Sequence, residues 1–178
     1  MNYYVVETDK HKLIQKTAGV KARQDVETIF KWNNFKKIEI PCLIEGRENK
    51  TRLGKIKAHY DVYMLWKNAL KKIKKNDWIY IQFPLLEHTM LFSLLIKNLE
   101  KRGIHTSIII HDVEAIRFTL RNDVPLSRKI RMRFEEISSF KNCSKIIVHN
   151  EKMKSFMHEK WKIHKDKMDI LGIFDYLV

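Results

Sequence analysis

The stretch Ser107-Ile-Ile-Ile-His-Asp-Val-Glu-Ala-Ile-Arg117 decides how the rest of the chain is interpreted. Three consecutive isoleucines, Ile108 to Ile110, predict a strand that is buried on both faces, as in a parallel sheet. This strand ends at His111-Asp112, and Glu114 and Arg117 follow at helical spacing. In an open α/β sheet, ligands bind at the carboxyl ends of the strands. We therefore expect these ionisable side chains to lie at a functional edge of a sheet.

Strand-like and helix-like patterns alternate along the whole chain. The expected strands cover residues 2–7, 36–40, 78–83, 104–111, 145–149 and 167–174. The expected helical segments between them cover residues 20–33, 53–75, 85–102, 125–140 and 151–161, and residues 112–121 are expected to form a short helix or an ordered loop. This alternation predicts an α/β fold, a doubly wound, Rossmann-like, mostly parallel six-stranded sheet with helices on both faces. No linker or repeat divides the chain, so we expect a single domain over residues 1–178.

Two of the expected helices carry apolar stripes that we expect to face the sheet. The first stripe comprises Leu53, Ile56, Tyr60, Tyr63, Trp66, Leu70 and Ile73. The second comprises Leu126, Ile130, Phe134, Ile137 and Phe140. The outer face of the first helix is basic, and it ends in Lys71-Lys-Ile-Lys-Lys75.

The composition bounds the class of protein and its partners. The 178 residues are 44% hydrophobic and 31% charged, which is typical of a folded domain. The net charge is +14, which favours an anionic partner such as nucleic acid, an anionic membrane surface or a phosphorylated substrate. A generally lysine-rich composition explains the same charge, and the two interpretations stay open. With two cysteines, no signal peptide and no apolar run of about 18 residues, we expect a cytoplasmic protein.

Several motifs that would assign a chemistry are missing from the sequence. There is no G-x-G-x-x-G after the first strand, no G-x-x-x-x-G-K-[ST] and no G-x-S-x-G. We therefore expect no dinucleotide cofactor, and neither a P-loop nor a serine-hydrolase site. No His, Cys or Asp cluster has the spacing of a metal site, and no nucleic-acid-binding motif is present, which argues against a nucleic-acid partner.

The strongest site candidates follow the isoleucine strand. If the strand order is 3-2-1-4-5-6, the crevice at the switch point is lined by the loop Thr8–Gly19 and by His111–Arg117. His111 or Asp112 could act as a general base, although Asp112 could equally cap the following helix. Glu114 and Arg117 could contact a substrate, or they could form a structural ion pair three residues apart.

Further candidates flank this group. Arg117 and Arg121 share a helical face, so they either hold an anion between them or belong to a solvated basic face. The segment Lys16–Lys21, with Gly19 and Lys21, could grip a polar group at the mouth of the crevice or be an exposed polar loop.

Two more strands end in residues that could contact a ligand. Gln82 and Phe83 close the third strand, where Phe83 could stack on a sugar ring or pack in the core. Asn150 follows the fifth strand and could contact a ligand, but it also suits the N-cap of the next helix.

Five short motifs occur one after another along the chain. They are Ala22-Arg-Gln-Asp-Val-Glu27, Gln82-Phe-Pro84, Ile110-His-Asp-Val-Glu-Ala-Ile-Arg117, Ile147-Val-His-Asn-Glu-Lys-Met153 and Leu171-Gly-Ile-Phe-Asp-Tyr176. This pattern resembles the bacterial β-1,6-galactofuranosyltransferase and adhesin-glucosyltransferase group, which consists of two-domain GT-B enzymes. The resemblance covers nearly the whole chain.

The resemblance implies a function for the crevice. In GT-B enzymes the N-terminal domain mainly holds the acceptor, and the C-terminal domain binds the nucleotide sugar. We therefore expect the acceptor half of a transferase, with the donor-binding domain absent and the fragment alone inactive. Asp112 or His111 would assist deprotonation of an acceptor hydroxyl, and Asp9 is a third candidate because the first loop faces the same crevice. No cofactor and no catalytic metal are expected.

The expected partners follow from the same resemblance. They are a UDP-sugar donor and a saccharide or lipid-linked saccharide acceptor used in cell-surface glycan synthesis. Peripheral contact with the inner face of the membrane and a homo-oligomer through the apolar helix 85–99 are further expectations. The alternative interpretation is a stand-alone flavodoxin-like binding module for an anionic partner, either nucleic acid or a membrane surface.

Overall fold

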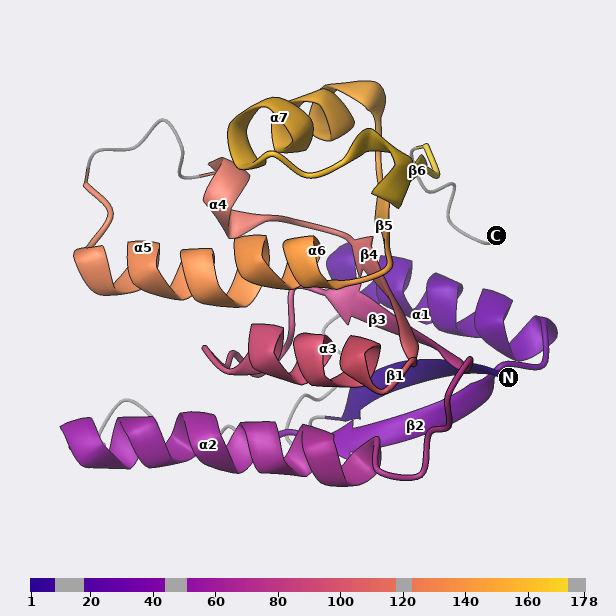
Figure 1. Cartoon of the computed structure of the whole chain (residues 1–178), viewed down its shortest axis with the longest axis horizontal. Coiled ribbons are helices and arrows are strands. Elements are labelled where there is room, and N and C mark those ends of the chain that lie inside the picture. Colours follow the sequence, from indigo (N-terminus) through magenta and orange to yellow (C-terminus); the bar gives the residue numbers. More distant parts are fainter. Residues whose placement is uncertain (9–17, 44–50, 118–122, 173–178) are drawn as a thin grey trace.

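Six parallel strands form one sheet at the centre of the molecule (Figure 1). The computed structural model describes residues 1–8, 18–43, 51–117 and 123–172. The strands are β1 (Asn2–Thr8), β2 (Lys36–Pro41), β3 (Trp78–Phe83), β4 (His105–Ile110), β5 (Lys145–Val148) and β6 (Met168–Ile170). Every neighbouring pair is parallel, which confirms the expected α/β class.

The strand order corrects the expected position of the switch point. The order is β2-β1-β3-β4-β5-β6, not 3-2-1-4-5-6, because the connection after β2 crosses β1 and inserts β3 beside it. The direction of winding therefore reverses between β1 and β3, as in flavodoxin-like sheets. As a consequence, the carboxyl end of β3 lies next to that of β1, and β4 is one strand further away.

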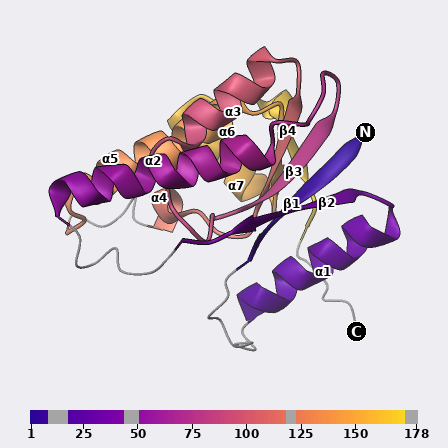
Figure 2. The ribbon, with the colours of Figure 1, turned by 90° about the horizontal axis from the view of Figure 1, so that it is seen from below.

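Helices cover the two faces of the sheet unequally. The helices are α1 (Ala18–Trp32), α2 (Arg52–Ala69), α3 (Phe92–Lys101), α4 (Glu114–Arg117), α5 (Leu126–Met132), α6 (Ser138–Asn142) and α7 (Glu151–Trp161). A π-helix, Arg133–Ile137, joins α5 to α6, and a short 3₁₀ turn, Lys165–Lys167, precedes β6. Figure 2 shows α1 on one face of the sheet and α2, α3 and α6 on the other.

The isoleucines of β4 belong to two different cores. Ile108 and Ile110 pack into the larger cluster, which the sheet forms with α2, α3, α6 and α7. Ile109 packs into the smaller cluster with Val26 and Phe30 of α1. Full burial of such a side chain contributes about 1.5–3 kcal/mol. The prediction of a strand buried on both faces is therefore confirmed.

The apolar stripe of α2 is only half buried, which corrects the expectation that all of it faces the sheet. Tyr63 and Trp66 are buried, but Leu53, Ile56 and Tyr60 are exposed. An 18-residue helix is about 27 Å long, whereas a six-residue strand spans about 20 Å. The first turns of α2 therefore extend past the sheet (Figure 1).

Most of the apolar stripe expected to face the sheet over residues 126–140 is exposed to solvent instead. Leu126, Ile130 and Phe134 are exposed, and only Phe140 is fully buried. The π-helix explains this result, because its hydrogen bonds join residues five apart and it turns less per residue. Phe140 is thereby rotated onto the inner face, together with Glu135 and Glu136, which have no exposed surface.

This rotation predicts that the two phenylalanines differ in their effect on stability. Phe140→Ala should lower the free energy of unfolding by about 3–5 kcal/mol, because it leaves a cavity beside Phe83. Phe134→Ala should change it by about 0.5 kcal/mol, because the side chain is 50% exposed. Urea unfolding of both variants measures the difference. Equal losses would contradict the assigned helix rotation.

Candidate functional site

Glu7, at the end of β1, fixes the segment that follows β3. Its two carboxyl oxygens accept hydrogen bonds from the backbone N–H groups of Leu86, at 2.8 Å, and Glu87, at 3.2 Å. Burial raises the pKa of Glu7 to about 7, although these two hydrogen bonds oppose the shift. The contact therefore joins the two strand ends on either side of the switch point.

Arg23 of α1 reaches the same edge from the other face of the sheet. Its guanidinium donates a hydrogen bond to the carbonyl oxygen of Pro84, directly after β3. Burial lowers the pKa of Arg23, and the nearby carboxyl of Glu7 opposes that shift. The side-chain amide of Gln82 donates to the carbonyl oxygen of Arg23 at 3.4 Å, so α1 is tied to β3 as well.

His111 is held between its neighbours at the end of β4. Its backbone N–H donates to the carbonyl of Phe83 at 2.8 Å, and its Nε2 lies 2.7 Å from Oε1 of Gln82. Because the amide nitrogen of Gln82 donates to Arg23, its oxygen must accept from Nε2–H, and we assign Nδ1 as the unprotonated nitrogen. Nε2 of His149 lies 3.3 Å from the carbonyl oxygen of His111 and completes the row.

The ring of His111 is neutral under physiological conditions. Burial lowers its pKa to about 4, and the charges of Arg23 and His149 lower it further in the same direction. Protonating this ring would place a second cation beside Arg23 in a poorly solvated position. His111 therefore provides an uncharged surface next to Asp112.

Asp112 is the accessible member of the predicted pair. One carboxyl oxygen accepts from the backbone N–H of Val113 at 2.8 Å, and the other pairs with the guanidinium of Arg117. The side chains of Asp112 and Arg117 are 41% and 60% exposed. A carboxylate has about four lone-pair positions, so Asp112 can accept a further hydrogen bond from a ligand.

Glu114 has different partners from those expected. Its carboxylate pairs with Arg128 at 2.7 Å and with Arg131, both from α5, whereas Arg117 pairs with Asp112. The expected Glu114–Arg117 ion pair is thus replaced by pairs across two helices. These contacts anchor α4, which begins two residues after Asp112, against α5.

Two buried glutamates of the π-helix extend this anchor. Oε1 of Glu135 lies 2.5 Å from Nδ1 of His88, in the segment after β3, and 3.6 Å from Arg131. Glu136 accepts from the backbone N–H of Ala115 at 2.8 Å. Burial raises the pKa of Glu136 to about 7, and the carboxyls of Glu114 and Glu135 add to the shift. The π-helix therefore fixes both α4 and the segment after β3.

The other predicted residues have varied positions. Phe83 is fully buried and its ring contacts Phe92 and Phe140, so it belongs to the core and is not available to stack on a sugar. Asn150 caps α7 by accepting from the backbone N–H of Met153 at 2.9 Å. Gly19 lies in the first turn of α1 and Lys21 is exposed on the same helix. Asp9 and Arg121 lie outside the described residues.

The residues that hold the edge together were not predicted from the sequence. Arg23 lies inside the motif Ala22–Glu27, but nothing in its spacing shows that it crosses to β3. Glu7 ends the first strand, and a charged residue at that position was the available signal. In a regular helix, Glu135 and Glu136 would lie on the polar side. The π-helix turns them toward the interior instead.

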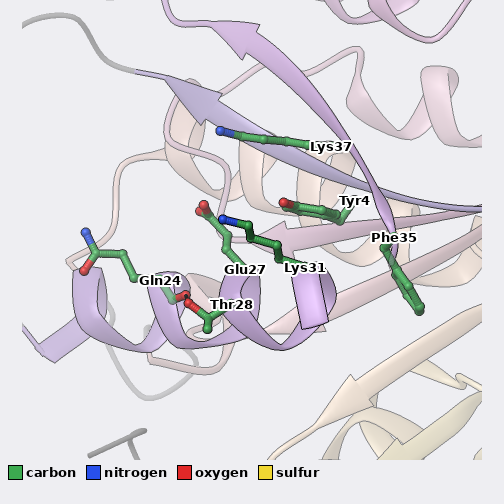
Figure 3. Close-up of a pocket in the computed structure, with 7 residues that line it drawn as sticks. All are labelled: Tyr4, Gln24, Glu27, Thr28, Lys31, Phe35 and Lys37. Atoms are coloured by element: carbon green, nitrogen blue, oxygen red, sulfur yellow. Dashed lines mark hydrogen bonds between the residues drawn. The ribbon is translucent and has the colours of Figure 1, made fainter. Parts of the chain in front are cut away.

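A groove of about 520 Å³ lies between α1 and the edge of the sheet (Figure 3). It is lined by Tyr4, Gln24, Glu27, Thr28, Lys31, Phe35 and Lys37. Gln24, the neighbour of Arg23, lies at one end of the groove and Phe35 lies at the other. Burial raises the pKa of Glu27, and Lys37 is paired with Glu39 at 2.6 Å. The groove offers hydroxyl, amide and charged groups of both signs.

The geometry of the edge favours a polar ligand that carries hydroxyl groups. A neutral imidazole and an accessible carboxylate stand on consecutive residues, on a framework fixed by hydrogen bonds. Within the described part of the chain, no three His, Cys, Asp or Glu side chains are grouped to hold a metal ion. None of the described helices is both long and apolar enough to cross a bilayer.

The chain matches a known protein family. A family model described as "Glucosyltransferase 3-like, N-terminal domain" matches residues 2–173. A search of the curated proteins finds no match. The matched range includes all six strands and the row of residues from Arg23 to His149.

The raised pKa of Glu136 predicts a pH-dependent variant. Between about pH 4.5 and about 7 the folded state binds more protons at this carboxyl than the unfolded state, so its contribution to stability falls as pH rises. Glu136→Gln keeps an acceptor for Ala115 but removes the titration. The free energy of unfolding of the variant, minus that of the wild type, should therefore increase over this pH range. A difference that is independent of pH would contradict the buried position of the carboxyl.

Proposed function

Because the chain belongs to the glucosyltransferase 3-like N-terminal domain family, we propose that it is the acceptor-binding half of a GT-B glycosyltransferase. The enzyme would transfer a hexosyl group from a UDP-sugar to a saccharide or lipid-linked saccharide during synthesis of a cell-surface glycan. The description of the family favours a glucosyl group, and the sequence resemblance also allows a galactofuranosyl group. The donor would be bound mainly by a second domain.

The observation that carries this proposal is the arrangement of Asp112 and His111 at the carboxyl edge of a parallel sheet. In such sheets this edge is where ligands bind. The acceptor hydroxyl would hydrogen-bond to Asp112, which projects from the edge, while the row Arg23–Gln82–His111–His149 fixes the backbone behind it. The groove beside α1 could hold a more distant part of the acceptor.

Of the two candidates that the structure describes, Asp112 is the more accessible to a hydroxyl group. The ring of His111 is fixed through Nε2, which donates to Oε1 of Gln82. The carboxylate of Asp112 is 41% exposed, and its ion pair with the exposed Arg117 contributes only about 0–1 kcal/mol, so a ligand can compete for it. We therefore assign proton removal to Asp112 and positioning to His111.

Cytoplasmic synthesis suits this assignment, because a UDP-sugar is available in the cytoplasm and a lipid-linked acceptor would be met at the inner face of the membrane. A homo-oligomer is compatible with the proposal but is not required by it.

The proposal predicts the effect of one isosteric substitution. In the enzyme that includes the donor-binding domain, Asp112→Asn should lower the rate of transfer about 10²–10⁴-fold, because the amide cannot take the proton. The matched control is Asp169→Asn, which changes another exposed aspartate that is paired with a basic residue, Lys145 at 3.1 Å. Its rate should equal that of the wild type. Unchanged transfer by Asp112→Asn, with the fold intact, would remove the assignment.

A further inference from the structure

Exposed apolar side chains of α2, of α5 and of the π-helix that continues α5 are not used by the core. The six largest are Leu53 at 79% exposed, Ile56 at 66%, Tyr60 at 53%, Leu126 at 73%, Ile130 at 40% and Phe134 at 50%. We call these six residues the apolar patch. Within each helix they recur at intervals of three or four residues, so each set shares one helical face. Isolated exposed apolar residues are ordinary, but two such faces together indicate a contact surface.

The two halves of the apolar patch lie at the same end of the molecule. Both helices begin at the left in Figure 1, beyond the start of α3, and both also begin at the left in Figure 2. This is also the end at which the strands of the sheet finish, because the helices run antiparallel to the strands (Figure 1). The apolar patch therefore flanks the edge that carries Asp112.

Basic side chains surround the apolar patch. Arg52, Lys55 and Lys57 of α2 are exposed, as are Lys129 of α5 and Arg133 of the π-helix. Across Arg52–Ala69 and residues 126–134, the only acidic residue is Asp61. Lys67 lies in the last turn of α2, and Lys71, Lys72, Lys74 and Lys75 follow the end of the helix. This combination of apolar and cationic groups is typical of surfaces that bind a lipid interface.

Charge decides between a lipid surface and a second copy of the chain. A symmetric dimer through the apolar patch would bring the same basic residues of two chains together, and each chain already carries a net charge of +14. An anionic lipid surface instead attracts these residues and accepts the apolar side chains below its headgroups. Tyr60 suits the boundary between the lipid headgroups and the apolar interior, because its ring is apolar and its hydroxyl is polar.

We propose that the apolar patch and its surrounding basic residues dock the chain onto an anionic lipid surface. The docking does not depend on the proposed sugar transfer. If that function also holds, docking would place the edge with Asp112 close to the headgroups, where a lipid-linked saccharide presents its sugar. The two proposals can fail separately, because one is measured by vesicle binding and the other by transfer.

Vesicle sedimentation tests the proposal with the chain as it is. Wild type should sediment with vesicles that contain about one-third phosphatidylglycerol, and it should stay in solution with pure phosphatidylcholine. Leu53→Ser with Ile56→Ser should weaken the partition at least about tenfold, because two inserted side chains are lost. Lys57→Glu with Lys129→Glu should weaken it as well, and added salt should have the same effect on the wild type.

A matched control lies on the opposite face of the molecule. Ile29 and Trp32 of α1 are 43% and 66% exposed, so Ile29→Ser with Trp32→Ser removes similar apolar surface from α1. This variant should bind anionic vesicles as the wild type does, and thermal unfolding checks that all three double variants are folded.

Three results would overturn the proposal. One is the absence of vesicle binding combined with a concentration-dependent dimer that Leu53→Ser with Ile56→Ser abolishes, which would assign the apolar patch to a second copy. Another is equal binding to mixed-sequence DNA and to anionic vesicles, combined with unchanged vesicle binding by Leu53→Ser with Ile56→Ser. That result would show attraction to any polyanion. The third is an equal loss of vesicle binding in the α1 control.

Discussion

Ile108 and Ile110 pack against α2, α3 and α6, while Ile109 packs beneath α1 on the other face of the sheet. A strand with no face in water leaves no place for a charged side chain along its length. The ionisable residues of this segment can therefore begin only where the strand ends, at His111 and Asp112. Because all neighbouring strands are parallel, the ends of β1, β3 and β5 meet at the same edge and contribute Glu7, Gln82 and His149.

The edge is stabilised by hydrogen bonds that satisfy buried polar groups. An unpaired buried donor or acceptor costs about 1–3 kcal/mol, and a buried charge costs more. Glu7 is satisfied by two backbone N–H groups, Arg23 by the carbonyl of Pro84, and Gln82 by Arg23 and His111. Glu135 contacts the ring of His88, and Glu136 accepts a hydrogen bond from the backbone N–H of Ala115. Asp112 is 41% exposed in front of this hydrogen-bonded edge, which is an arrangement that suits a positioned proton acceptor.

Features that depend on local sequence were predicted, and features that depend on distant packing were not. The strand 78–83 and the cap formed by Asn150 follow from residue type and neighbours alone. The position of β3 beside β1 depends on which way a long connection crosses the sheet, and the sequence does not encode that locally. Likewise, the stripe at residues 126–140 assumes a regular helix, and the π-helix changes the face on which its residues lie. Asp112 and His111 could be proposed from the sequence because polar residues after a buried strand are a local signal, whereas Arg23 reaches the carboxyl edge from α1 across the sheet.

A titration of the isotope-labelled chain with a saccharide acceptor, followed by amide NMR, tests the central claim most directly. Binding at the carboxyl edge predicts shifts of the amides of His111, Asp112 and Val113 and of residues 84–88, because these backbone groups form or flank the site. Shifts at the groove beside Tyr4 and Lys37 would extend the acceptor site along α1. Shifts confined to the amino ends of the strands, with residues 111–113 unchanged, would contradict the account.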